Sequence, residues 1–180
     1  MVRSIALSSS RSKPHVAPFV GPAWYAAAAW LALAVVAQTT FVHYLAIRNV
    51  VPSFVLVVVI WYAIRVDALR AVLYGLIAGL CEDALSAGTG AAWMIATSVS
   101  ALLASRLSRG FFADSIPLVI GITALVTLVR ALLFWVVMAI GGYPPGLGTM
   151  HLHQALGQAA LNVGVIVAAM LIMRRFDVTP

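Results

Sequence analysis

The sequence predicts an all-α membrane protein, a bundle of about six transmembrane helices with both the N and C termini in the cytoplasm. Three observations predict it. Hydrophobic residues make up 63% of the 180-residue chain and charged residues only 9%, well below the roughly 25% of a soluble domain. The apolar residues gather in long runs separated by short polar or glycine-containing turns. If successive runs cross the membrane in alternating directions, the cations between them fall almost entirely on one side of it, as the positive-inside rule requires.

The chain opens with a polar segment. Residues 1–22 are rich in serine, proline and basic residues, and we expect them to form a disordered cytoplasmic tail. The first apolar run covers residues 24–42. A Val-Val-Ala triplet at 35–37 resembles a signal-peptide cleavage site, but the polar lead is long and further spans follow, so we predict a retained helix. Residues 23–175 then form one six-helix transmembrane domain, and 176–180 a short cytoplasmic tail.

The second predicted span, residues 50–64, is unusually short. Its 15 residues would make a helix of about 22 Å, against a hydrocarbon core of about 30 Å. Trp61, Tyr62 and Arg65 could reach the headgroups and close the gap, and a re-entrant segment is the alternative. The remaining predicted spans are 69–87, 91–107, 116–140 and 152–173.

The arginines and lysines set the orientation. Only Arg48 falls on one side of the membrane, and Arg130 lies within a span. The cations on the opposite side are Arg3, Arg11, Lys13, Arg65, Arg70, Arg106, Arg109, Arg174 and Arg175. This bias places both termini and the second and fourth connections in the cytoplasm. It also accounts for the net charge of +6 without nucleic-acid binding.

Three charged residues lie inside predicted spans. Glu82 and Asp83 are in the third span and Arg130 is in the fifth, where each charge costs about 2.5–3.5 kcal/mol on insertion scales. Asp83 and Arg130 stand at equal distances along their spans from the cytoplasmic side, so we predict that Arg130 pairs with Asp83 or Glu82. The pair either fixes helix register or forms part of a proton or ion relay. The few titratable groups in other spans favour the structural alternative.

Small residues recur at spacing four in the third span, at Ala71, Gly75 and Gly79, and Gly88 and Gly90 follow in the turn after it. Such a face lets another helix approach closely. The face serves either packing within the chain, which we favour, or contact with a partner's transmembrane helix. Comparable small-residue faces occur in the fourth span (Ala92, Ala96, Ser100, Ala104) and the sixth span (Ala160, Gly164, Ala168), and they are equally plausible docking sites.

A polar stripe marks the sixth span, with Gln154, Gln158 and Asn162 at spacing four. These side chains either hydrogen-bond across helices, which we favour, or line a small pocket open to the periplasm. Gln38, Thr39 and Thr40 in the first span are expected to face this stripe.

The sequence predicts no enzyme, no metal site and no cofactor. His151 and His153 are two residues apart with no nearby carboxylate, which is a weak metal pattern. The chain has no phosphate-binding loop, nucleophile elbow or catalytic cysteine–histidine set. A membrane enzyme would have to work from Glu82, Asp83 and Arg130 alone.

Residues 79–90 resemble the signature of the MreD family, in which a glycine–leucine pair precedes an aspartate, a leucine-rich turn and a glycine that opens the next helix. The matching residues are Gly79, Leu80, Asp83, Leu85, Gly88 and Gly90. Pro52, at the start of a short second span, also resembles the family. The likeness in size, helix count and orientation covers residues 24–175.

This resemblance implies a non-catalytic scaffold or regulator of cell shape and side-wall peptidoglycan synthesis in the bacterial inner membrane. The implied partners are MreC, the MreB filaments, and RodA with its partner transpeptidase, besides the lipid bilayer. The Gly75/Gly79 face and the cytoplasmic loops would be binding surfaces. The family also resembles the fold of substrate-binding subunits of energy-coupling-factor importers.

A vitamin-importer subunit of that energy-coupling-factor type is therefore the alternative function. It shares the size, the six spans and the lack of an ATPase motif. A vitamin pocket needs several polar and aromatic side chains from the periplasmic loops. The sequence offers mainly His43, Tyr44, Asn49 and Tyr143 there, so we rank this alternative below the scaffold.

Overall fold

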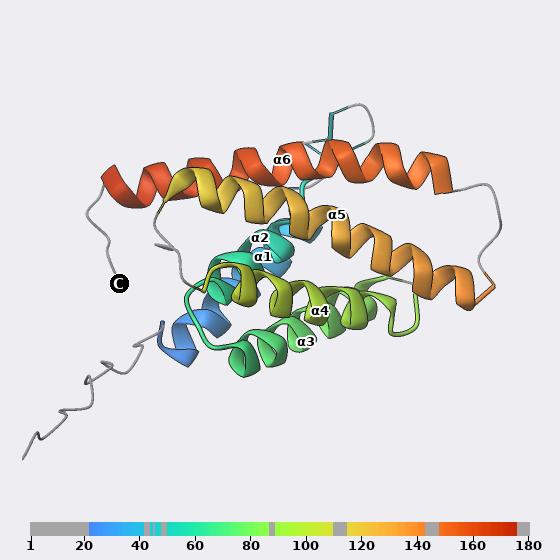
Figure 1. Cartoon of the computed structure of the whole chain (residues 1–180), viewed down its shortest axis with the longest axis horizontal. Helices are drawn as coiled ribbons and strands as arrows, with labels where there is room; N and C mark the ends of the chain where they lie inside the picture. The colour runs from blue at the N-terminus through green and yellow to red at the C-terminus, as the bar shows by residue number, and fades with distance from the viewer. Residues whose placement is uncertain are drawn as a thin grey trace, which may run out of the picture.

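The computed structural model of the chain describes residues 22–41, 44, 46–47, 50–86, 89–109, 115–142 and 148–175. These residues contain six α-helices, in agreement with the predicted all-helical class (Figure 1). The helices are α1 (Trp24–Thr40), α2 (Phe54–Ala63), α3 (Ala68–Leu85), α4 (Ala92–Leu107), α5 (Ile116–Ile140) and α6 (Gly148–Arg175). The tails predicted at 1–22 and 176–180 lie outside the described residues, apart from Pro22.

Two of these helices are long and apolar enough to cross a membrane by length and composition. They contain the segments Ile116–Ile140 in α5 and Met150–Met173 in α6. Helices α1, α2 and α4 are also apolar but have fewer residues. The shortest, α2, has 10 residues and is therefore about 15 Å long, half the thickness of a hydrocarbon core.

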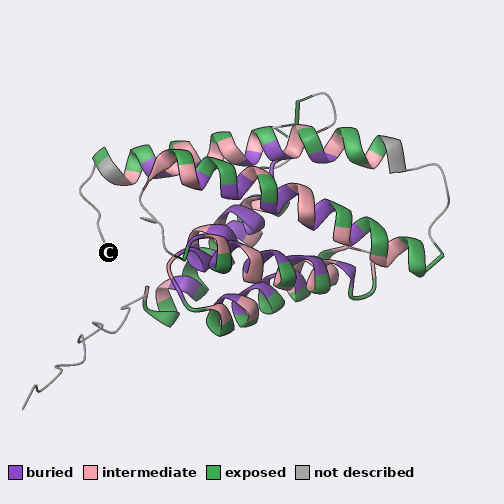
Figure 2. Ribbon diagram, in the orientation of Figure 1, coloured by how far each residue is buried: buried purple, intermediate pink, exposed green. Residues whose placement is uncertain are grey.

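Helix α2 lies at the centre of the bundle and contacts all five other helices. Val55, Leu56, Val59 and Ile60 on this helix are completely buried, and Figure 2 shows the same concentration of buried residues there. Helices α3 and α4 form an antiparallel hairpin on one side of α2, and α5 and α6 form a second antiparallel pair along the opposite side (Figure 1). The described chain begins and ends at the same end of the bundle (Figure 1).

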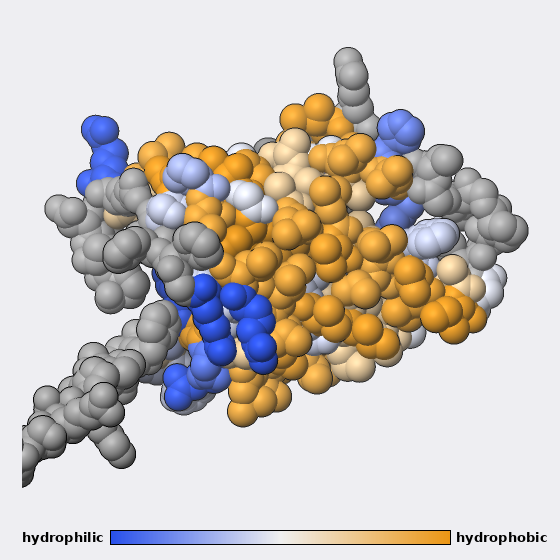
Figure 3. Space-filling view, viewed as in Figure 1, coloured by the Kyte–Doolittle hydropathy of each residue, from blue (hydrophilic) through white to orange (hydrophobic). Residues whose placement is uncertain are grey.

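The face of the bundle shown in Figure 3 is apolar over most of its length. Large hydrophobic side chains such as Leu69, Leu73, Leu132 and Leu171 are more than half exposed. Such a surface would associate in water but suits contact with lipid.

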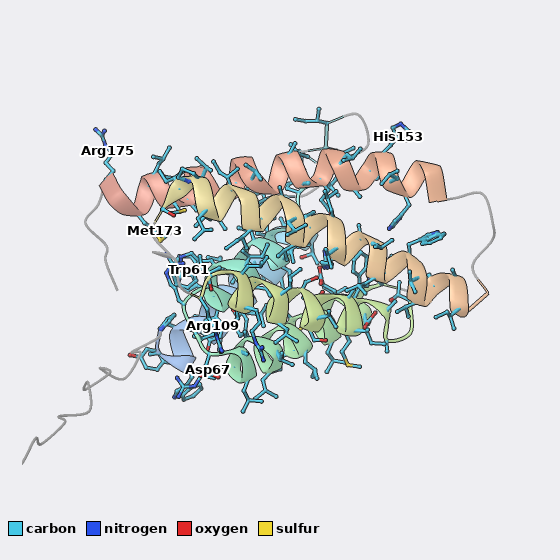
Figure 4. The ribbon with its side chains drawn as sticks, viewed as in Figure 1. Trp61, Asp67, Arg109, His153, Met173 and Arg175 are labelled. Carbon is cyan, nitrogen blue, oxygen red and sulfur yellow. The ribbon has the colours of Figure 1, made fainter. Side chains whose placement is uncertain are left out.

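Charged residues gather at one end of the bundle, which we call the arginine-rich end. In Figure 4, Asp67, Arg109 and Arg175 lie toward this end, and His153 lies toward the other. The arginines placed there by the ends of their helices are Arg65, Arg70, Arg106, Arg109 and Arg175. This grouping follows the positive-inside pattern of the sequence.

The second span differs from its predicted extent. A helix was expected over 50–64, but α2 begins at Phe54, and residues 50–53 are not helical. Pro52 disfavours a helical conformation in the residue before it. Ser53 is the N-cap of α2, and its hydroxyl oxygen accepts a hydrogen bond from the backbone N–H of Leu56 at 3.2 Å. The chain therefore enters the bundle as extended backbone before the helix starts.

Candidate functional site

The candidate site is a polar centre built around Arg130 in the middle of α5. This side chain is only 2% exposed, and its Nη2 forms an ion pair with the Glu82 carboxylate on α3. Glu82 is itself 12% exposed, so both charges are largely removed from solvent. Of the two carboxylates predicted as partners, Glu82 and not Asp83 contacts the guanidinium.

Thr97 on α4 hydrogen-bonds to both members of the ion pair. Arg130 Nε donates to the Thr97 hydroxyl oxygen at 3.0 Å, and this hydroxyl donates to the Glu82 carboxylate at 3.2 Å. Arg130 Nη1 also lies 3.5 Å from the Ser53 hydroxyl oxygen at the start of α2. The guanidinium thereby connects α5 to α2, α3 and α4. A buried charge needs this number of partners because each unpaired donor costs free energy in an apolar medium.

An aromatic column extends from the guanidinium. The Arg130 Cζ atom lies 4.3 Å from the centre of the Trp93 ring, a cation–π contact. Trp93 stacks on Phe134 at 3.9 Å between centroids, and Phe134 stacks on His151 of α6 at 5.5 Å. This column was not predicted from the sequence, where His151 stood out only as half of a weak metal pattern. The spacing of four between Arg130 and Phe134 on α5 was the available signal.

The start of α2 carries backbone N–H groups that must be satisfied inside the bundle. The Ser53 N–H donates to the Asn162 side-chain oxygen at 2.7 Å. The Phe54 N–H donates to the Gln38 side-chain oxygen, also at 2.7 Å. Helices α6 and α1 thus supply the acceptors that hold the first turn of α2 in place.

The carbonyl groups before α2 are satisfied in the same way. Gln158 donates to the Val51 carbonyl at 3.1 Å, and Gln38 donates to the Pro52 carbonyl at 3.4 Å. The Asn162 amide donates to the Thr127 hydroxyl on α5 at 3.2 Å.

The residues of the predicted polar stripe do not all have the same role. Gln158 and Asn162 form hydrogen bonds to other helices or to the segment before α2, and Gln38 from the first span hydrogen-bonds to that same segment, as expected. Gln154 is half-buried and makes no hydrogen bond to another described residue. Thr39, also expected to face the stripe, donates to the carbonyls of Val35 and Val36 within α1.

Asp83 has a different role from its neighbour Glu82. Its carboxylate accepts hydrogen bonds from the backbone N–H groups of Trp93 at 3.1 Å and Met94 at 2.8 Å, and from the Thr89 hydroxyl at 2.9 Å. The N-cap position of α4 is Ala91, which has no side-chain acceptor. Asp83 supplies the missing cap from the adjacent helix, and its negative charge complements the positive end of the α4 dipole. Of the two predicted alternatives, the structure contains the Arg130–Glu82 pair and not the Arg130–Asp83 pair.

The small-residue face of α3 is occupied by α4 of the same chain. A methyl group at Gly75 would lie 2.7 Å from the Ala101 side chain, and one at Gly79 would lie 2.5 Å from the Met94 Cα atom. Ala71 on this face is completely buried. These residues allow the hairpin helices to approach closely, and α4 leaves no room there for a partner's helix.

Two further glycines were predicted to belong to this face and its turn. Gly90, in the turn before α4, has a backbone φ of +60°, which favours glycine. Gly88 lies outside the described residues.

The other two small-residue faces differ in exposure. Ala92, Ala96, Ser100 and Ala104 on α4 are completely buried. Ala160, Gly164 and Ala168 on α6 are exposed, and a methyl group at Gly164 would meet no atom within 4 Å. Of the three faces, only the one on α6 is open to the surroundings.

An apolar exterior, a cationic end and a buried ion pair together define an all-helical membrane protein whose helices are joined by a polar centre. The family model described as rod shape-determining protein MreD matches residues 22–176. The chain therefore belongs to the MreD family, as its signature residues predicted, and has a part in determining rod shape. Comparison with curated proteins and with solved structures finds no match.

Proposed function

We propose that this protein is a non-catalytic scaffold or regulator of side-wall peptidoglycan synthesis that acts by binding MreC. Through MreC it would join the complex that contains MreB filaments, RodA and its partner transpeptidase. The observation that carries this proposal is the family match over residues 22–176, which includes all six described helices. The same match favours a shape-determining role over the vitamin-importer alternative.

The family signature supports a structural role for the centre of the molecule. Gly79 allows the close approach of α4, Asp83 caps that helix, and Gly90 makes the turn between them. These residues fix the hairpin on which Glu82 and Thr97 meet Arg130. In this proposal the ion pair sets the positions of α2 and α5 and is not part of a proton or ion relay.

We place the protein in the bacterial inner membrane as a multi-pass protein with both termini in the cytoplasm. The support is the arginine-rich end, where the described chain both begins and ends. Cationic residues near the ends of spans are retained on the cytoplasmic side.

The exposed face of α6, Ala160–Gly164–Ala168, is our proposed contact for a transmembrane helix of the partner. It is the small-residue face that the bundle does not cover. Small residues at spacing four let two helix backbones approach closely, and the resulting van der Waals packing favours association of helices in lipid. A leucine at Gly164 would keep the surface apolar but prevent this close approach.

Co-purification from native membranes tests the proposal. The tagged full-length protein should recover MreC, and Gly164→Leu should reduce that recovery several-fold. Gly121→Leu on α5 is the matched control, because Gly121 is also exposed and has no atom within 4 Å of an added methyl group. Gly121→Leu should leave the recovery of MreC unchanged.

Two results would contradict this account. Equal recovery of MreC with both variants would move the contact away from α6. Recovery of an ATPase pair and a coupling subunit, without proteins of wall synthesis, would replace the scaffold by the importer alternative.

A further inference from the structure

A groove of about 590 Å³ runs between α1 and α3 at the arginine-rich end. Its volume lies within the roughly 300–1,000 Å³ typical of small-molecule sites. The α1 wall contains Ala28 and Leu31, and the α3 wall contains Leu73 and Ile77. These side chains are all apolar, and the groove opens on the outer surface of the bundle.

The base of the groove is a fixed contact between its two walls. The Tyr74 hydroxyl on α3 donates to the Ala27 carbonyl on α1 at 2.8 Å. Tyr62 of α2 packs against the Tyr74 ring at 4.3 Å between centroids. Tyr62, Tyr74 and Ala27 are buried, so the groove has a closed floor rather than a path through the bundle.

One end of the groove carries a guanidinium group, which belongs to an exposed ion pair. Arg70, in the first turn of α3, lines the groove and has a side chain that is 64% exposed. Its Nε pairs with Asp67 Oδ2 at 3.3 Å, and its two terminal nitrogens have no partner among the residues that the structure describes. Trp24, which is 80% exposed, lines the groove at the start of α1. Tryptophan and arginine at the end of apolar helices are typical of the membrane–water interface.

We propose that this groove binds an anionic glycerophospholipid. One acyl chain lies between α1 and α3, and the phosphate accepts hydrogen bonds from the terminal nitrogens of Arg70. Charge complementarity selects this occupant, because a guanidinium with unused donors stands at the end of an otherwise apolar slot. Basic pockets between transmembrane helices on the cytoplasmic side are suited to anionic headgroups. The inference rests on the proposed orientation in the inner membrane but not on the proposed binding of MreC.

Native mass spectrometry of the full-length protein released from detergent tests the site. The protein is incubated with phosphatidylglycerol and phosphatidylethanolamine of identical acyl chains, in equal amounts. The wild type should retain one phosphatidylglycerol in preference to phosphatidylethanolamine, and Arg70→Gln should reduce this preference roughly fivefold. Arg109→Gln is the matched control, because Arg109 is exposed at the same end but does not line the groove.

The apolar part of the groove is tested with a second pair of variants. Ala28→Trp would fill the space between α1 and α3 and should abolish retention of either lipid. Ala29→Trp places the same side chain at the next exposed position, outside the groove, and should have no effect.

The proposal is overturned if the wild type retains no lipid or shows no preference for the anionic one. It is also overturned if Arg109→Gln lowers the preference as much as Arg70→Gln does, since general surface charge would then explain the binding. A polypeptide retained at the groove in place of lipid would identify the occupant as a partner's helix and equally reject the proposal.

Discussion

Arg130 on α5 and Glu82 on α3 form an ion pair inside the bundle, and Thr97 on α4 hydrogen-bonds to both of them. Three helices are joined by three side chains that would be costly to bury alone. Such a pair is weak evidence for high stability, because its attraction is offset by the loss of hydration. It is strong evidence for a specific arrangement, because removing either partner leaves the other charge buried without compensation.

A double-mutant cycle on this pair is the first prediction. Arg130→Met and Glu82→Leu should each destabilise the protein by about 3–5 kcal/mol, because each leaves one buried charge unpaired. The double variant should recover most of that loss, since two apolar side chains need no compensation. Thermal unfolding in detergent, followed by size-exclusion chromatography, measures both effects. Single variants as stable as the wild type would show that the pair contributes nothing to the fold.

Asn162 should be more important to stability than Gln154, the residue of the predicted stripe that makes no cross-helix hydrogen bond to a described residue. Asn162→Ala leaves the Ser53 N–H without an acceptor inside the bundle, at a cost of about 1–3 kcal/mol. Gln154→Ala is the control on the same helix, and it should change stability by less than about 0.5 kcal/mol. The same unfolding assay compares the two. A larger loss for Gln154→Ala would mean that the entry to α2 is held by other contacts.

The α3–α4 hairpin should be sensitive to a single methyl group. Gly79→Ala places its Cβ atom 2.5 Å from the Met94 Cα atom, so the two backbones must separate, at a cost of about 1–3 kcal/mol. Gly121→Ala on α5 meets no atom within 4 Å, and better helix propensity should make it neutral or stabilising by up to about 1 kcal/mol. Melting temperatures of the two variants give the comparison. Equal melting temperatures would show that the close approach of α3 and α4 at Gly79 is not needed for stability.

Asp67 at the start of α3 should make stability depend on pH in the acid range. The backbone N–H of Arg70 donates to its carboxylate at 3.1 Å, and this bond, with the nearby Arg70 charge, holds the pKa of Asp67 below its ordinary value of 3.8. Because the folded pKa is depressed, the stabilisation is present above 3.8 and is lost as the pH falls through the folded value.

Two variants separate the cap from the charge at this position. Asp67→Ala should be destabilised relative to the wild type at neutral pH, and this difference should shrink below pH 3.8. Asp67→Asn retains a hydrogen-bond acceptor and should lose only the pH-dependent part. Thermal unfolding from neutral pH to below pH 3.8 measures the stability difference between each variant and the wild type. A difference between the wild type and Asp67→Ala that grows toward acid would reverse the sign and contradict the assignment.

The sequence was enough to predict the helices, because long apolar runs admit few other structures in lipid. Counting the rise along each span was also enough to predict that Arg130 lies at the same height in the bundle as the two carboxylates. It could not choose between Glu82 and Asp83. Neighbouring residues differ by only about 1.5 Å along the axis but point about 100° apart, so the choice depends on how α3 is rotated against α4 and α5.

The entry to α2 shows the same limit. The short second run and Pro52 indicated an unusual span, but the extended segment before Phe54 depends on acceptors and donors from distant helices. Gln38 and Asn162 are far from Ser53 in the sequence, and their contacts arise only when the bundle is assembled. Asp83 likewise caps a helix other than its own. Local signals predict a cap within one helix and not one supplied by its neighbour.

The most direct test of the central claim is the shape of cells that carry the double variant Arg130→Met/Glu82→Leu as their only copy of the protein. If the ion pair is structural and the protein acts as a non-catalytic scaffold, this variant should be present at normal levels and the cells should remain rods. Round cells in which the variant is folded and abundant would contradict the account, because the two charges would then have a function beyond holding the helices together.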